Sequence, residues 1–299
     1  MLAKKIRRMQ PLRTLKPLTK GLATYIIPPH LLKRGGEETA SAAYCYSTLL
    51  RHAIKLHQAG LDPFKGTMAE LGPGASLGVG LGALLMGVER YVGLDLQDYA
   101  FGQDNLDVFD ELVTLFQNRE DISKDPALSG IKPVIDTHAF PCDVFPDDKL
   151  KECLDSSRLT SLRNSLAQKD GPVSYAAPWT HSTDIKANSI HWIFSQAVLE
   201  HVDDLEITYR LFADWLEPGG FMSHQIDFKS HGFAPEWNGH WGYSPTLWKL
   251  VRGGRKYAIN RAPNSTHINL IEKNGLKIVS AETIPMEGGL SRAQMAEPL

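Results

Sequence analysis

Cysteine is scarce, and its spacing excludes two kinds of covalent or metal support. The 299 residues contain three cysteines, Cys45, Cys142 and Cys153. Three thiols form no paired disulfide framework, and none of the spacings matches the Cys-x-x-Cys pattern of a structural zinc ion. We therefore expect a chain that folds in a reducing compartment around a hydrophobic core.

Long apolar runs are also missing. No stretch reaches the roughly 20 apolar residues that a membrane-spanning helix needs, and the first residues lack the apolar core of a secretion signal. With 42% apolar and 22% charged residues, the chain is able to bury one large core with added segments. The sequence thus predicts a cytoplasmic globular protein.

Acidic residues are absent from residues 1–36, which contain nine Lys or Arg. The rest of the chain carries 23 basic and 34 acidic residues, a net charge of −11. Leucines and isoleucines recur among the bases, so this basic arm is partly amphipathic. It could lie on an anionic membrane surface, or against the acidic body of its own chain or of a partner subunit. Nucleic acid is not expected as a partner, because the acidic body would repel phosphates.

Residues 68–78 read Met-Ala-Glu-Leu-Gly-Pro-Gly-Ala-Ser-Leu-Gly. Thr67–Leu71 is short and mostly apolar, which is typical of a buried strand, and Gly72 and Gly74 follow at a turn before a predicted helix. In a doubly wound sheet this turn borders the crevice in which ligands bind. Glu70 adds a carboxylate there, which favours a cationic ligand over a pyrophosphate.

A second strand is predicted over Arg90–Asp95, and Asp95 follows Gly74 by 21 residues. An acid at this position accepts charge-assisted hydrogen bonds from the two hydroxyls of a ribose. Leu96 follows it directly. The glycine turn and the acid together predict a nucleoside site.

Three ordered motifs resemble those of class I S-adenosylmethionine-dependent methyltransferases. They are the E-x-G-x-G turn, the run F-S-x-A-V-L-E-H-V at 194–202, and W-L-x-P-G-G at 215–220. The resemblance covers about residues 68–227 and, more weakly, 266–284, where a last helix and a sixth strand at 275–279 are expected. It implies an α/β fold, a Rossmann-like, doubly wound, mostly parallel sheet, with S-adenosyl-L-methionine as cosubstrate.

The resemblance also implies which residues hold the cosubstrate: Glu70, Gly72, Gly74, Asp95, Leu96, Asp143, Ser195 and Gln196. Asp143 lies in Phe140–Val144, which resembles the third-strand motif whose acid contacts adenine, although it could instead be a turn residue. Ser195 ends the fourth strand, predicted over 189–195, and Gln196 follows it, where the loop faces the transferred methyl group.

Two departures from the family pattern bear on chemistry. His191 occupies the position where the family usually has Asp in the fourth strand. A few quinone methyltransferases bind a divalent cation with E-x-x-E-H after this strand, but Ala197 stands in place of the first Glu. We therefore expect no metal on the helix that carries His201, and His201 reads as a structural residue.

A hydroxyl acceptor needs a base to take its proton. The richest candidates follow the fifth strand: His224, Asp227 and His231. Their spacing suits a His-carboxylate base, a structural polar network or metal ligation. We expect the first of these, with no metal.

Aromatic residues mark two candidate acceptor-binding segments. One is the apolar loop at 172–179 with Tyr175 and Trp179, and the other contains Trp237, His240 and Trp241. Tryptophan faces stack well on sugars or flat rings, although either segment could simply pack as a small satellite core. Similar motifs occur in methyltransferases of cell-surface polysaccharide synthesis, so we expect a small-molecule or glycan acceptor, methylated at oxygen. The basic arm would suit a lipid-linked acceptor and peripheral membrane contact.

The predicted organisation is an arm at 1–36 and a methyltransferase domain at 37–299. Insertions are expected at about 99–137, 147–188 and 228–262. A helix at 37–58 is expected to cover the cosubstrate, with His52 within reach of the pocket. A further helix is predicted at 150–166. Two other functions remain open: non-methyl chemistry of the same cosubstrate, such as aminocarboxypropyl transfer or cyclisation, and an inactive binding protein. The sequence leaves the oligomeric state open.

Overall fold

The computed structural model describes residues 11–27, 41–100, 105–123, 128, 130–179, 185–255 and 258–296. They form two compact units. The sheet unit comprises the described residues of Gly35–Val198 and Ile207–Gln225. The C-terminal unit comprises those of Met1–Arg34, Leu199–Glu206 and Ile226–Leu299.

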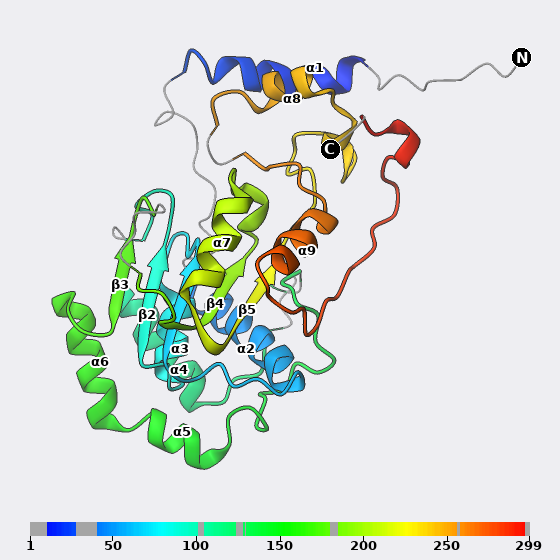
Figure 1. Cartoon of the computed structure of the whole chain (residues 1–299). Helices are drawn as coiled ribbons and strands as arrows, with labels where there is room; N and C mark the ends of the chain where they lie inside the picture. The colour runs from blue at the N-terminus through cyan, green and yellow to red at the C-terminus, as the bar shows by residue number, and fades with distance from the viewer. Residues whose placement is uncertain are drawn as a thin grey trace, which may run out of the picture. The chain divides into compact units, whose positions relative to one another are not determined.

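The sheet unit is built on five parallel strands in the order β3-β2-β1-β4-β5 (Figure 1). The strands are β1 Thr67–Leu71, β2 Arg90–Leu94, β3 Val173–Ala176, β4 Ile190–Gln196 and β5 Leu216–Gln225. The strand order reverses between β1 and β4, which is the switch point where ligands bind in open α/β sheets. The predicted α/β fold with a Rossmann-like parallel sheet is confirmed.

Helices cover both faces of this sheet. They are α2 Ala42–Gln58, α3 Gly78–Leu85, α4 Asn105–Gln117, α5 Asp147–Cys153, α6 Ser156–Gln168 and α7 Leu205–Trp215. Neighbouring strand residues point to opposite faces: on β5, Ser223 bonds to His52 of α2, whereas the His224 ring stacks on Phe212 of α7. The helices α2 and α7 therefore lie on opposite faces, as a doubly wound fold requires.

Several predicted elements differ from the structure. Residues 140–144 form a turn rather than the third strand, which is β3. Phe140 and Phe145 are buried in the core, so the apolar pattern anchors a turn. The helix expected at 150–166 is two helices, because Asp155 caps the start of α6 by accepting from the amides of Ser157 and Arg158. Residues 275–279 form no strand.

The C-terminal unit contains α1 Pro11–Ala23, α8 Pro245–Arg252, α9 Asn264–Lys273 and the 3₁₀ segments Leu199–His201, Gly239–Gly242 and Arg292–Gln294. Its own small core includes Phe233, Tyr243, Val251 and Ile259. The expected last helix is α9. No helix in the described ranges has both the length and the apolar character needed to cross a bilayer.

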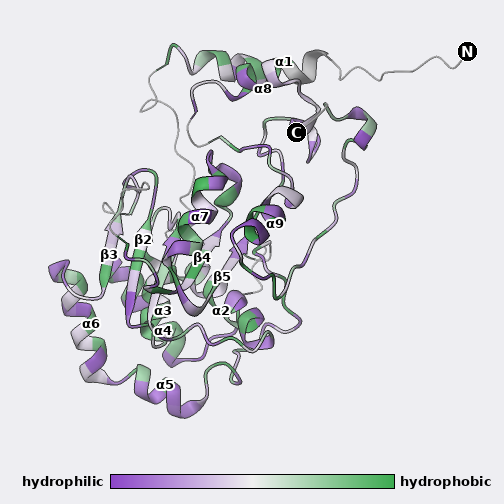
Figure 2. Ribbon diagram, in the orientation of Figure 1, coloured by the Kyte–Doolittle hydropathy of each residue, from purple (hydrophilic) through white to green (hydrophobic). Residues whose placement is uncertain are grey.

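The described part of the basic arm packs on its own chain. Helix α1 contacts α8 so closely that a Cβ on Gly21 would lie 2.1 Å from the carbonyl oxygen of Leu250. The amide of Gly254 donates to the Thr24 hydroxyl at 2.7 Å. Hydrophobic and hydrophilic residues are interspersed along α1 (Figure 2), as its predicted amphipathic character requires.

Candidate cosubstrate site

The turn after β1 is shaped by two glycines. Gly72 and Gly74 have φ angles of +69° and +74°, in the left-handed region that glycine adopts without a steric penalty. A Cβ on Gly72 would lie 2.5 Å from Cγ2 of Val198. The Gly72 amide donates to the carbonyl of Leu94 at 2.7 Å, which ties the turn to the end of β2.

Asp95 lies directly against this turn, as its sequence spacing predicted. Its Oδ2 accepts from the amide of Gly74 at 3.1 Å, and its Oδ1 accepts from the amide of Leu96 at 2.7 Å. The side chain is only slightly exposed, and burial raises the pKa of Asp95. Leu96 is 43% exposed beside it, so an apolar surface adjoins the acid.

Glu70 is the second acid of the site. Its side chain is buried, and Oε2 accepts from the Tyr91 hydroxyl at 2.6 Å. Burial, with a further contribution from the Asp95 charge, raises the pKa of Glu70 to about 8. A buried carboxylate of this kind is stabilised by a nearby cation. Tyr91 was not predicted as a site residue; the signal that marks it is a tyrosine inside the short strand β2.

Tyr175 and Trp179 lie beside Asp95, although both were predicted for the acceptor. Tyr175 belongs to β3 rather than to a loop, and its hydroxyl donates to the carbonyl of Gln97 at 3.1 Å. The amide of Trp179 donates to the carbonyl of Asp95 at 2.7 Å. A cavity of about 420 Å³ adjoins Tyr175; Leu77, Ala100, Asn105 and the end of α6 also line it. These aromatic residues therefore border the predicted nucleoside region.

The end of β4 holds a buried polar chain. Gln196 donates from Nε2 to the carbonyl of Lys132 at 3.1 Å, so its Oε1 accepts from His52 Nε2 at 3.0 Å. His52 Nδ1 therefore accepts from the Ser223 hydroxyl at 2.5 Å. Burial lowers the pKa of His52 to about 4, so the ring is neutral near pH 7. These bonds fix both the tautomer of His52 and the position of Gln196.

The three predicted catalytic residues have different partners. His224 Nδ1 lies 2.8 Å from the Ser195 hydroxyl, and its ring stacks on Phe212 at 5.5 Å. Asp227 Oδ2 instead lies 3.5 Å from His231 Nε2. His224 belongs to the sheet unit, whereas Asp227 and His231 belong to the C-terminal unit. His224 is thus held by polar and aromatic neighbours, and its catalytic role stays a prediction.

Asp143 and His240, predicted to contact adenine and the acceptor, lie in surroundings that the sequence did not indicate. Asp143 is exposed on the turn at 140–144 and ends no strand, so the strand that would aim it at adenine is absent there. His240 is 2% exposed, its ring 4.7 Å from that of Trp241, and burial lowers the pKa of His240 to about 4. The predicted acceptor contact of His240 stays a prediction. Trp237 and Trp241 remain partly exposed, with ring centroids 6.2 Å apart.

No family model matches the chain, and no curated protein matches its sequence. Among solved structures, the chain is similar to the YcgJ protein of Bacillus subtilis, with 12% identity over 75% of this chain and 67% of that one, at a TM-score of 0.38. Phosphoethanolamine N-methyltransferase 2 of Haemonchus contortus, in complex with S-adenosyl-L-methionine, shares 14% identity over 78% of this chain, at a TM-score of 0.38.

The chain spans only 40% of that nematode enzyme. An S-adenosylmethionine-dependent methyltransferase of Mesorhizobium loti shares 13% identity over 74% of this chain and 79% of its own length, at a TM-score of 0.40. At such scores the likeness carries no information on chemistry, and the fold assignment rests on the strand order of the chain itself.

Proposed function

We propose that this protein is an S-adenosylmethionine-dependent methyltransferase. The observation that carries the proposal is the contact between Asp95 and the amide of Gly74 at the end of a parallel strand, with Glu70 buried behind the same turn. The cosubstrate combines ribose hydroxyls, which a carboxylate accepts from, with cationic ammonium and sulfonium groups, which buried carboxylates attract.

Methyl transfer is an in-line displacement, so the protein chiefly aligns the nucleophile, the methyl group and the leaving sulfur. In this proposal the hydrogen-bonded chain through His52 and Gln196 holds the end of β4 rigid beside the transferred group. We propose a small-molecule or sugar acceptor, methylated at oxygen.

The test is turnover with cosubstrate labelled in its methyl group, with sugars, phenols and amines as acceptors. Methyl transfer yields S-adenosylhomocysteine and a labelled acceptor. Methylthioadenosine would instead indicate aminocarboxypropyl transfer or cyclisation, and binding without any product would indicate an inactive binding protein. Either of these two outcomes overturns the proposal.

Removing the Asp95 carboxylate tests the nucleoside site. Asp95→Ala is expected to weaken binding of S-adenosylhomocysteine by about 1.5–3 kcal/mol, because a charge-assisted hydrogen bond is lost. Titration calorimetry measures the affinity. Asp107→Ala, which changes an exposed acid on α4, is the control. Unchanged affinity in a folded Asp95→Ala variant contradicts the assignment.

We further propose that α1 and the residues after it contact an anionic membrane that carries the acceptor. Tyr25 and Ile26 are 58% and 86% exposed, and Lys16 and Lys20 are exposed on the preceding helix. Exposed apolar side chains insert at a lipid interface while nearby bases attract anionic headgroups.

Ile26→Asp is expected to lower binding to vesicles of phosphatidylglycerol and phosphatidylcholine by about tenfold, because an apolar contact is replaced by a repelled charge. Cosedimentation measures it, with pure phosphatidylcholine vesicles for comparison. Val279→Asp is the matched control, since Val279 is 62% exposed in the same unit but belongs neither to α1 nor to the residues directly after it. Equal binding by both variants contradicts the membrane contact.

A further inference from the structure

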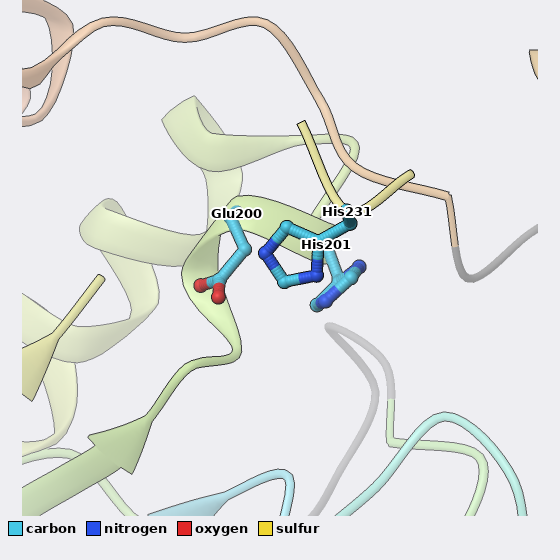
Figure 3. A group of neighbouring side chains, drawn as sticks. All are labelled: Glu200, His201 and His231. Atoms are coloured by element: carbon cyan, nitrogen blue, oxygen red, sulfur yellow. The ribbon is translucent and has the colours of Figure 1, made fainter. Parts of the chain in front are cut away.

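Three side chains with metal-binding chemistry meet in the C-terminal unit. Glu200, His201 and His231 each offer one ligand atom, and these atoms all lie within 4.8 Å of one another (Figure 3). Glu200 and His201 come from the 3₁₀ segment after β4, and His231 comes from the loop that follows β5. The group contains one carboxylate and two imidazoles.

Glu200 is the least expected member of the group. Its side chain is 3% exposed, and neither carboxylate oxygen has a hydrogen-bond partner among the described residues. A buried carboxyl without a partner is costly, and such groups call for an unrecorded ion or ligand. His201 is half-buried and His231 is exposed, so the group opens toward solvent on one side, where an ion is able to enter.

The surrounding residues hold the ligands in place. Asn260 donates through its backbone amide to the carbonyl of Glu200 at 2.5 Å, and through Nδ2 to the carbonyls of Leu199 and Val202 at 2.8 and 2.9 Å. These bonds fix the 3₁₀ segment. Asp227 lies 3.5 Å from His231 Nε2 and orients that ring. Ligands supported by a shell of this kind bind metals more tightly.

The positive charge of Lys229, close to this group, would repel a bound cation. The ammonium group of Lys229 lies 3.0 Å from Asp227 Oδ2, so its charge is paired with a carboxylate that is not itself a member of the group. The Lys229 side chain is 54% exposed, and solvent further screens it. The positive charge of Lys229 is therefore too weakly felt at the three ligands to prevent a divalent cation from binding.

We propose that Glu200, His201 and His231 bind one divalent transition-metal cation of the Zn²⁺, Mn²⁺, Fe²⁺ and Co²⁺ class. Imidazole nitrogens suit these ions, whereas Mg²⁺ and Ca²⁺ prefer all-oxygen sites. Three protein ligands leave at least one coordination position open for water or for a substrate oxygen. The E-x-x-E-H pattern predicts no metal here because Ala197 replaces its first glutamate, but in this proposal His231 supplies the third ligand from 30 residues further along the chain.

The experiment uses the untagged full-length chain after dialysis against a chelator. Titration calorimetry with Zn²⁺ measures affinity and stoichiometry, and the visible absorption of added Co²⁺ reports the coordination. One equivalent is expected to bind. Glu200→Gln and His231→Gln are each expected to weaken Zn²⁺ binding by more than about 100-fold, since loss of supporting residues alone costs 10- to 100-fold.

Asn260→Ala removes only a supporting residue and is expected to weaken Zn²⁺ binding by the smaller factor of about 10- to 100-fold. The matched controls are Glu89→Gln and His57→Gln, which change exposed residues of the sheet unit and are expected to leave affinity unchanged. Circular dichroism checks folding, and the exposed position of His231 makes that variant the safer one. Failure of the wild-type chain to bind Zn²⁺ and Co²⁺, or equal affinity in the ligand variants, overturns the proposal. Because no cosubstrate is added, the outcome is independent of the methyltransferase assay.

Discussion

Glu70 illustrates how burial alters a single residue. The carboxyl accepts hydrogen bonds from the Tyr91 hydroxyl and the Gly80 backbone, but it has almost no contact with solvent, and this burial raises its pKa from 4.5 to about 8. Near pH 7 the unliganded side chain is therefore mostly protonated. A bound sulfonium or ammonium group would favour the ionised form, which couples cosubstrate binding to loss of a proton.

The pKa shift of Glu70 predicts a pH-dependent stability. Because the folded-state pKa lies above the unfolded one, the stabilising effect is complete below about pH 4.5 and is lost as the pH rises to about 8. Glu70→Gln removes this loss, so the variant is expected to gain stability relative to wild type between these pH values. Urea unfolding at several pH values measures it. Glu89→Gln, on the surface, serves for comparison; parallel curves for wild type and Glu70→Gln would refute the shift.

At the scale of elements, the turn between β1 and α3 depends on two glycines, which have no side chain. Gly72 needs both a left-handed backbone and the space next to Val198. The turn places the Gly74 amide against Asp95, so backbone geometry and ligand chemistry are joined at one point. A substitution there acts on folding and on binding together.

Gly72→Ala is expected to destabilise the protein more than Gly60→Ala. Both glycines have left-handed φ angles, +69° and +75°, but a Cβ on Gly60 meets nothing within 4 Å. Each variant pays about 1–2 kcal/mol for the backbone conformation, and Gly72→Ala adds about 1–3 kcal/mol for the collision with Val198. Denaturant unfolding compares the two. Equal losses would show that the turn relaxes and that the close approach is unimportant.

At the scale of the whole molecule, a helix near the start of the chain packs against a helix near its end. Helix α1 packs on α8, more than 220 residues later in the sequence, and the described part of the basic arm therefore belongs to a compact unit with the last quarter of the chain. The same helix leaves Leu15 and Leu22 more than 40% exposed. One face thus serves packing, and the other remains available for the proposed membrane contact.

Gly21→Ala tests this long-range contact, because close packing reverses the sign of the expected change in stability. In an isolated helix, alanine is favoured over glycine by about 1 kcal/mol. Here the added Cβ would lie 2.1 Å from the carbonyl oxygen of Leu250, so the variant is expected to lower the melting temperature and to speed proteolysis within residues 11–27. Gly130→Ala, at an open position, is the control. A stabilised Gly21→Ala protein would contradict close packing of α1.

Local patterns along the chain were sufficient for the strands at 67–71 and 90–94, for the glycine turn, and for the placement of Asp95 beside it. The reason is physical: an apolar run, a left-handed turn and a strand-end acid each express constraints on a few neighbouring residues. The parallel sheet follows from their order, because strands that alternate with helices pack in only a few ways.

Tertiary structure decided the features that depend on which distant segments meet. Residues 140–144 look like a strand, but Phe140 and Phe145 anchor a turn in the core. The third strand instead lies at 173–176, and Asp143 is exposed. His224 pairs with Ser195, and His231 joins Glu200 and His201, although spacing alone grouped the two histidines. Side-chain partners of this kind are set by the packing of whole elements, which no local pattern encodes.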